Sequence, residues 1–279
     1  SFTEKHIDLT ETQNGTTTNG NKIITGLTDT SQLIVGMLAT GTGIGAAPNA
    51  IASIDSATQV TLSVNSTASA TVAVTFKAVV SLPHDIFAFD NSGTVKLEMV
   101  AWTNTTTRAT ALAFQNGVYV KNGATTRRYL GTICTTTTGG QTEDSLTSRF
   151  VWNYYNSVMS KLYFNPDTNW TYNNASWRSA NNNATYRINF VIGVAERLVD
   201  VINSGMILNT NNSSASIGLG LDITNGSSTL PSYMPYLSIN STSYRFGHCR
   251  YLDYTSIGSH YLQMTESVSG LTVAFYWTT

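Results

Sequence analysis

Charged residues are scarce in this sequence. Only 11 % of its 279 residues are Asp, Glu, Lys or Arg, less than half of the roughly 25 % found in globular proteins. The net charge is −1 and the basic residues are scattered, so no basic stripe exists that could neutralise a nucleic-acid backbone. Disordered chains are highly charged and poor in aromatics, whereas 10 % of these residues are aromatic. The composition therefore predicts a folded chain with no nucleic-acid partner.

Long apolar runs and paired cysteines are also missing. No apolar stretch is long enough to span a bilayer as a helix, and the N-terminus lacks the basic and apolar regions of a secretory signal. These two absences predict synthesis in a cytoplasm and no membrane partner. The two cysteines, Cys134 and Cys249, form no CxxC pair. Burial as small apolar side chains is the favoured interpretation, and one long-range disulfide is the alternative.

What the sequence does contain is typical of β structure. Hydrophobic residues reach 41 %, and Thr, Ser and Asn take the place of charged residues on a solvated sheet surface. Two Asn-Gly pairs, at 116–117 and 122–123, suit tight hairpin turns. In residues 139–164 the apolar spacing fits either a helix or a strand, and a loop at 143–148 followed by a strand is favoured over a helix. Apolar alternation between turn signals predicts strands at 22–25, 33–38, 50–54, 59–64, 71–79, 184–194, 217–223, 244–251 and 271–277.

The expected fold class is all-β. The composition of the sequence changes near residue 80, where aromatic residues become more frequent and the predicted strands become longer. We therefore expect a small N-terminal β module at residues 1–79. A jelly-roll-like antiparallel β-sandwich is expected at residues 80–279, because regularly spaced strands with Gly, Asn and Ser turns favour two packed sheets.

One glycine-rich segment invites a different interpretation. Gly41-Thr-Gly43-Ile-Gly45-Ala46 is close to the fingerprint that binds a dinucleotide pyrophosphate. That site requires a strand, the glycine turn and then a helix, but Pro48 follows and residues 59–64 alternate as a strand. The segment is therefore predicted to be a loop between strands, and no cofactor is expected.

Acidic and histidine residues form no catalytic or metal-binding pattern. Hydrolysis of glycans needs two carboxylates that face one another, whereas adjacent residues such as Glu143 and Asp144 point to opposite faces of a strand and are better suited to a polar turn. The histidines show no spacing of zinc ligands. No catalytic residue, cofactor-binding residue or metal ligand is therefore predicted. The residues weighed were Glu143, Asp144, Glu196, Asp200, Asp222, Asp253, His6, His84, His248 and His260.

Aromatic residues cluster between positions 152 and 177. The favoured interpretation of this cluster is packing in the core and at subunit interfaces, where aromatics dominate. The alternative is a glycan or receptor contact in the Asn-rich stretch NPDTNWTYNNASW, formed by Trp170, Tyr172 and Trp177.

Two segments resemble structural proteins of tailed bacteriophages. Residues 16–76, which carry the words NGNKIITGL, VGMLATGTGI and ASIDSATQVTLS in this order, resemble a small β module common in such proteins. Residues 127–196, which carry YLGT, QTEDS, VWNYYN and FVIGVAE, are similar to a segment of tail-fibre-like or head-surface proteins.

The resemblance implies a non-enzymatic structural protein on the virion surface. Its expected form is a capsid decoration (cement) protein or a short fibre that acts as a homotrimer through subunit contacts. Its expected partners are further copies of itself and the major capsid protein or other virion proteins. The alternative function is a tail-fibre receptor-binding protein that recognises a host-surface glycan or protein.

Overall fold

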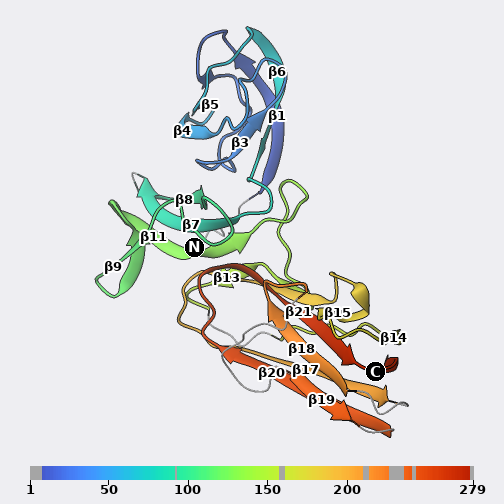
Figure 1. The fold of residues 1–279 in the computed structure, drawn as a ribbon. Coiled ribbons are helices and arrows are strands. Elements are labelled where there is room, and N and C mark those ends of the chain that lie inside the picture. The colour runs from blue at the N-terminus through green and yellow to red at the C-terminus, as the bar shows by residue number, and fades with distance from the viewer. Residues whose placement is uncertain are drawn as a thin grey trace. The chain divides into compact units, whose positions relative to one another are not determined.

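The structure is a computed structural model that describes residues 8–91, 93–156, 161–209, 214–225, 236–240 and 243–276. Strands make up nearly all of its regular structure (Figure 1), which confirms the all-β fold class. One 3-10 turn at Ala180–Asn182 is the only helical element in these ranges. The described residues contain no helix that is long and apolar enough to cross a membrane.

The chain divides into two compact units. Unit 1 comprises Ser1–Glu143 and Phe150–Ser157, and unit 2 comprises Asp144–Arg149 and Val158–Thr279. The boundary expected near residue 80 therefore falls inside unit 1.

A continuous core explains why no boundary lies near residue 80. Ile24 and Phe76, from the N-terminal strands, are fully buried in an apolar cluster. Ile86 and Met99, from beyond residue 80, belong to the same cluster. Because side chains on both sides of the expected boundary leave water together, the two parts are held as one unit by the hydrophobic effect.

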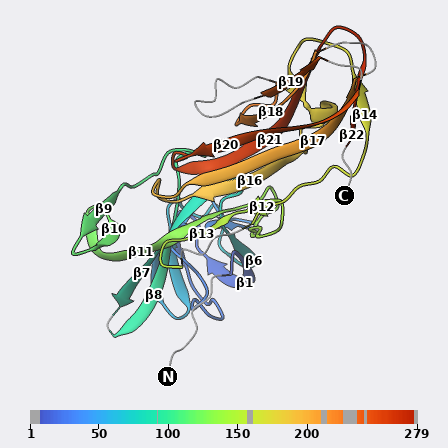
Figure 2. The ribbon, with the colours of Figure 1, turned by 90° about the horizontal axis from the view of Figure 1, so that it is seen from below.

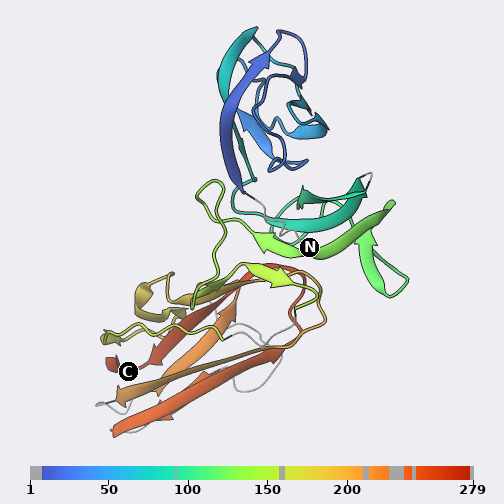
Figure 3. The same ribbon diagram turned by 180° about the vertical axis from the view of Figure 1, so that it is seen from behind.

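The N-terminal strands of unit 1 form two three-stranded sheets with the orders β1-β6-β3 and β2-β5-β4 (Figures 1 and 3). Every pair in them is antiparallel. These strands confirm the predictions at 22–25, 50–54, 59–64 and 71–79. Their bounds are β1 Thr10–Thr17, β2 Ile23–Ile24, β3 Leu38–Thr40, β4 Ile51–Ser56, β5 Gln59–Leu62 and β6 Ala70–Lys77.

The strand predicted at 33–38 is wrong. β3 begins only at Leu38, and the backbone N–H groups of Leu33 and Met37 donate to carbonyls three residues earlier, which closes two turns. Leu33 and Ile34 are both buried, although neighbours in a strand point to opposite faces. An apolar run buried in a core loop gives the same sequence signal as a buried strand.

The rest of unit 1 is one six-stranded antiparallel sheet of order β8-β7-β11-β10-β9, in which β13 also pairs with β11. The bends at 145–147 and the short strands β12 and β13 confirm the loop and strand expected in that stretch. The bounds are β7 Pro83–Asn91, β8 Thr94–Ala101, β9 Leu112–Gln115, β10 Val118–Lys121, β11 Ala124–Cys134 and β13 Val151–Asn153, while β12 Ser148–Arg149, just before β13 in sequence, belongs to unit 2.

Both Asn-Gly pairs lie at hairpin turns, as predicted. Asn116 (φ 52°) and Gly117 (φ 82°) join β9 to β10, the positive φ angles that a two-residue turn requires. Asn122 and Gly123 join β10 to β11, with a register shift at the start of the hairpin. These turns fix which side chains of β9, β10 and β11 lie opposite one another.

Unit 2 is a two-layer β-sandwich (Figure 2). One sheet has the order β12-β16-β21-β18-β19, with β15 on β21, and the other has the order β14-β22-β17-β20. The predictions at 184–194, 217–223, 244–251 and 271–277 are confirmed. The bounds are β14 Trp170–Tyr172, β15 Arg178–Ser179, β16 Arg187–Ile192, β17 Val199–Asn209, β18 Ser214–Leu221, β19 Tyr236–Asn240, β20 Ser243–Asp253, β21 Gly258–Ser269 and β22 Val273–Tyr276.

The connections of the sandwich are jelly-roll-like. The chain changes sheet from β16 to β17 to β18, and again from β19 through β20 and β21 to β22. A core cluster with side chains from both sheets, among them Ile207 and Phe275 on one and Ile217 and Val268 on the other, fills the space between the layers. The sandwich expected at 80–279 is thus formed by unit 2, and among its described strand pairs only β12 with β16 is parallel.

The glycine-rich segment 41–45 is a loop between β3 and β4, and no helix follows it. A Cβ atom on Gly41 would lie 2.5 Å from the carbonyl oxygen of Ala73, and one on Gly45 would collide with the carbonyl oxygen of Asn65. The glycines therefore allow the loop backbone to pack against neighbouring backbone, which confirms the loop prediction.

Alanine at position 41 should destabilise unit 1. The added Cβ meets backbone, which cannot rotate away, so we expect a loss of about 1–3 kcal/mol in the free energy of unfolding. Gly139 provides the matched control, because its Cβ would lie 3.4 Å from the flexible Lys77 side chain, and Gly139→Ala should change stability by less than about 0.5 kcal/mol. Denaturant unfolding of both variants tests this, and equal effects would contradict it.

Candidate functional site

Trp170, the first of the three aromatics suggested for glycan contact, lies in the core of unit 2. Its side chain is 8 % exposed, and its ring stacks on Phe275 with centroids 6.0 Å apart. The indole N–H donates to the Glu266 carboxylate at 2.5 Å. The packing interpretation therefore describes Trp170, since neither face of the ring is left for a sugar.

Tyr172 and Trp177 are half-buried. The Tyr172 hydroxyl donates to the Ser176 carbonyl at 2.7 Å, and the Arg178 guanidinium lies 3.8 Å from the centre of the Tyr172 ring. Because a cation on the ring face is itself a stabilising contact, Tyr172 offers less ring surface to a ligand than the sequence alone suggests.

Glu266 is a buried carboxylate that the sequence analysis missed. It lies on β21 and is 1 % exposed, and besides Trp170 it accepts hydrogen bonds from Arg178 Nε at 2.8 Å and the Asn181 backbone N–H at 3.1 Å. Burial raises the pKa of Glu266, and the bonds from Trp170 and Arg178 offset this only in part. These three partners are all donors, so the carboxylate joins β14, β15 and the 3-10 turn.

Asp85 is the corresponding buried carboxylate of unit 1. It is 2 % exposed on β7, and it accepts from Arg108 Nε at 2.7 Å and from the Thr132 hydroxyl at 2.7 Å. The Arg108 guanidinium lies 4.6 Å from the centre of the Trp102 ring. Burial raises the pKa of Asp85 in spite of the Arg108 charge. Because Arg108 and Thr132 bind Asp85 from different strands and loops, the Asp85–Arg108 ion pair, like Glu266, has the geometry of a structural brace, a buried contact that holds separate segments together.

The other carboxylates weighed in the sequence are engaged by separate partners. Asp144 pairs with Arg149 at 3.1 Å and Asp200 with Arg250 at 2.7 Å. The described residues contain no group of three or more His, Cys, Asp or Glu side chains placed to hold a metal ion. Both cysteines are buried thiols outside any disulfide, which confirms the favoured interpretation, and burial raises the pKa of Cys249 to about 12. His6 lies outside the described residues.

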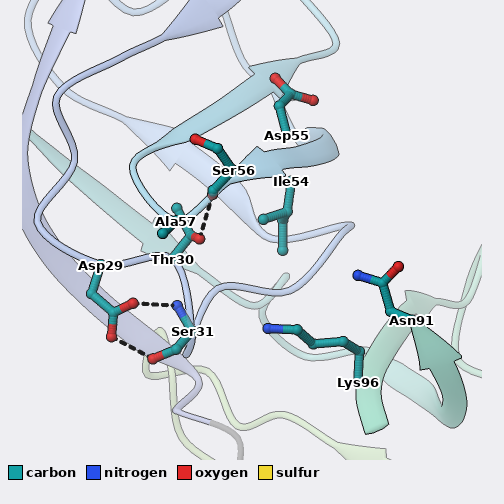
Figure 4. A pocket seen from close by; sticks show the side chains of 9 residues that line it. All are labelled: Asp29, Thr30, Ser31, Ile54, Asp55, Ser56, Ala57, Asn91 and Lys96. Atoms are coloured by element: carbon teal, nitrogen blue, oxygen red, sulfur yellow. Dashed lines mark hydrogen bonds between the residues drawn. The ribbon is translucent and has the colours of Figure 1, made fainter. Parts of the chain in front are cut away.

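One polar pocket lies in unit 1 (Figure 4). Its volume is about 280 Å³, and its lining includes Asp29, Asp55, Asn91 and Lys96. Asp29 accepts from the backbone N–H of Ser31 at 2.8 Å, and Asp55 is bonded by neighbouring hydroxyls. Lys96 reaches toward the pocket while the Asp55 carboxylate points away from it (Figure 4), so the charged groups do not converge on one ligand atom.

His260 of unit 2 is held between two acceptors. It is 4 % exposed, with Nδ1 2.7 Å from the Asp222 carboxylate and Nε2 3.0 Å from the Ser256 carbonyl. Because neither partner can donate, the doubly protonated ring satisfies both contacts. Burial lowers the pKa of His260, but the carboxylate of Asp222 and the nearby carbonyls outweigh this effect and raise it above 6.5.

Unit 2 should lose stability as the pH rises through the raised pKa of His260. In the unfolded chain the pKa is about 6.5, so the stabilisation is complete below that pH and disappears above the folded value. Urea unfolding across this range, with an NMR titration of the ring, tests the expectation. Asp222→Asn should remove this pH dependence; a folded pKa below 6.5 would contradict the prediction.

The exposed aromatic surface of unit 1 is the strongest candidate site. We define the aromatic strip as Phe114 on β9, Tyr119 on β10, and Tyr154 and Tyr155 just after β13. Successive ring centroids are 5.1, 5.3 and 5.0 Å apart, each pair nearly edge to face. Phe114 is 64 % and Tyr155 45 % exposed. The strip therefore places apolar ring surface in water on a fixed hairpin.

The aromatic strip is anchored in the core through Tyr154, one of its two middle rings. Tyr154 lies 6.1 Å from Tyr129 and 6.0 Å from Trp152, measured between ring centroids, and both of these rings are buried. Sequence reasoning noted Tyr154 and Tyr155 only as packing residues. The signal for the rest of the strip lies in the predicted Asn116-Gly117 turn, because its register sets Phe114 directly opposite Tyr119.

An exposed cation borders the aromatic strip. Arg128 Nε donates to the Tyr155 hydroxyl at 2.9 Å, and its guanidinium lies 4.6 Å from the centre of that ring. Nearby Lys121 and Arg127 both pair with Glu98, at 2.5 and 3.1 Å. Arg128 makes no ion pair with any residue of the described ranges, so its charge remains available beside the rings.

Comparison with known proteins gives no further identification. No protein-family model matches the chain, and neither a curated protein nor a solved structure was found to match it.

Proposed function

We propose that this chain is a non-enzymatic structural protein of a tailed-phage particle. It would lie on the virion surface as a capsid decoration (cement) protein or a short fibre, act as a homotrimer, and bind neighbouring virion proteins through broad contacts. The resemblance of residues 16–76 and 127–196 to phage structural proteins supports this function, as do the buried ion pairs that brace each unit.

One observation carries this proposal furthest: the outer face of the β17–β20 pair. Ile207 and Cys249 point into the core, so the alternate side chains of these two long strands face outward. Among them Phe246 is 81 % and Ile202 61 % exposed, and Asp200 and Arg250 form a two-point ion pair. Phe and Arg are enriched at protein interfaces, so this rigid face suits contact with a neighbouring subunit.

Location on the particle tests the proposal. Antibodies against the chain, applied to purified particles and viewed by electron microscopy, should label the head surface or short fibres. Phe246→Ser should reduce the assembled form in analytical ultracentrifugation, because a polar side chain at the centre of an interface forfeits apolar burial. Particles without label anywhere would overturn the virion assignment.

Recognition of a host-surface glycan or protein is the second candidate function. The aromatic strip favours it, since exposed rings on a rigid hairpin are costly to keep in water unless a ligand covers them. Label at the tail end of the particle, instead of on the head, would support this second function over the first.

A further inference from the structure

We propose that the aromatic strip and Arg128 together form a binding site for an acidic saccharide, one whose sugars carry carboxylates. This inference deepens the recognition function proposed above and rests on it. The site is not the Trp170 region suggested by the sequence, because Trp170 is buried and Arg178 lies on the ring of Tyr172.

The rings supply the apolar part of such a site. A sugar ring presents a face of C–H groups that packs on the electron-rich face of an aromatic ring. Phe114 and Tyr155 are exposed, while Tyr119 and Tyr154 between them are half-buried. Several rings in series suit a chain of sugars better than one monosaccharide. Because the hairpin and the buried rings hold the strip in place, little conformational entropy is lost on binding.

Arg128 supplies the charge that selects an acid. Guanidinium groups bind carboxylates through two parallel hydrogen bonds. The bond from Nε to the Tyr155 hydroxyl fixes the orientation of Arg128, and within the described part of the chain no residue bonds its two terminal nitrogens, which can therefore bind a ligand. Lys121 and Arg127 on the same strands share the Glu98 carboxylate, whereas Arg128 has no ion-pair partner among the described residues, so a neutral sugar would leave the Arg128 charge unmatched.

A second copy of the chain fits this surface less well. In a two-fold contact each copy presents the same patch to the other. The strip and Arg128 contain no carboxylate, so such a contact would bring one guanidinium toward another, and like charges disfavour an interface. The charge on this surface thus points to an anionic ligand.

A glycan array that carries uronic and sialic acid oligosaccharides beside their neutral counterparts provides the test. The full chain should bind acidic members and lose binding as salt is raised, because screening weakens an exposed charge contact. Titration calorimetry with the best acidic oligosaccharide should then show about tenfold weaker binding for Phe114→Ala. Arg128→Gln should bind acidic and neutral oligosaccharides equally weakly.

Tyr254→Ala is the matched control. Tyr254 is 63 % exposed but lies in unit 2, so its replacement should leave saccharide binding unchanged. Equal binding of neutral and acidic oligosaccharides, or no binding to any acidic member, would overturn the proposal. Dissociation of an oligomer by Phe114→Ala, seen by sedimentation, would also overturn it. Because these measurements use the isolated chain, their failure leaves the result of particle labelling unaffected.

Discussion

Glu266→Ala should cause the largest loss of stability in unit 2. Removal of the carboxylate leaves the Arg178 guanidinium, the Trp170 indole N–H and the Asn181 N–H without their acceptor. Breaking a buried ion pair by deleting one partner costs about 3–5 kcal/mol, a large part of the roughly 5–15 kcal/mol that stabilises a typical domain. We therefore expect the sandwich to be largely or wholly unfolded at temperatures where the unaltered unit 2 is folded.

Thermal unfolding followed by circular dichroism, with hydrogen exchange to locate the change, measures this effect. Glu266→Gln should lose less, because the amide keeps one acceptor oxygen. Asp144→Ala is the control within the same unit. Asp144 and Arg149 are 46 % and 35 % exposed, and an exposed pair of this kind contributes only about 0–1 kcal/mol. Equal losses for Glu266→Ala and Asp144→Ala would refute the bracing role of Glu266.

Asp85→Ala should have a comparable effect confined to unit 1. The Arg108 side chain is only 9 % exposed, so without Asp85 its charge would remain buried and would lose the carboxylate that it now contacts. We again expect a loss of about 3–5 kcal/mol. Hydrogen exchange should show faster exchange in β7 and β11 and little change in the strands of the sandwich.

The double variant Asp85→Leu, Arg108→Met tests the cause of that loss. If the cost arises from an unmatched buried charge, replacing both partners by apolar side chains should restore much of the stability. A double variant no more stable than Asp85→Ala would show instead that packing at this position, and not charge, dominates.

Much of the fold could be predicted from the sequence because the deciding signals are local. Alternation of apolar residues, Asn-Gly turns and β-branched composition act over a few residues, and they located most strands correctly. The 33–38 segment failed because Leu33 and Ile34 are buried in a turn by contacts from distant strands. The domain boundary failed for the same reason, since the contribution of Ile86 and Met99 to the N-terminal core is a long-range effect.

The candidate site was less accessible to sequence reasoning. Trp170 and Phe114 are both aromatic residues near turns, yet one is 8 % and the other 64 % exposed. Their difference depends on which strands pair. Phe114 and Tyr155 belong to one strip only because β10 joins β9 to β11 and β11 pairs with β13. The buried carboxylates Asp85 and Glu266 give no local signal either, because their partners are distant in the sequence.

The path of the chain between the units has a consequence for synthesis. Residues 144–149 contribute β12 to unit 2 before residues 150–157 return to complete unit 1 with β13. The ribosome therefore synthesises β12 well before its partner β16. The six-stranded sheet of unit 1 remains incomplete until β13 has been synthesised after β12. A single cut in the gene after residue 143, 149 or 157, where the chain passes from one unit to the other, yields no fragment that holds all the strands of one unit and none of the other.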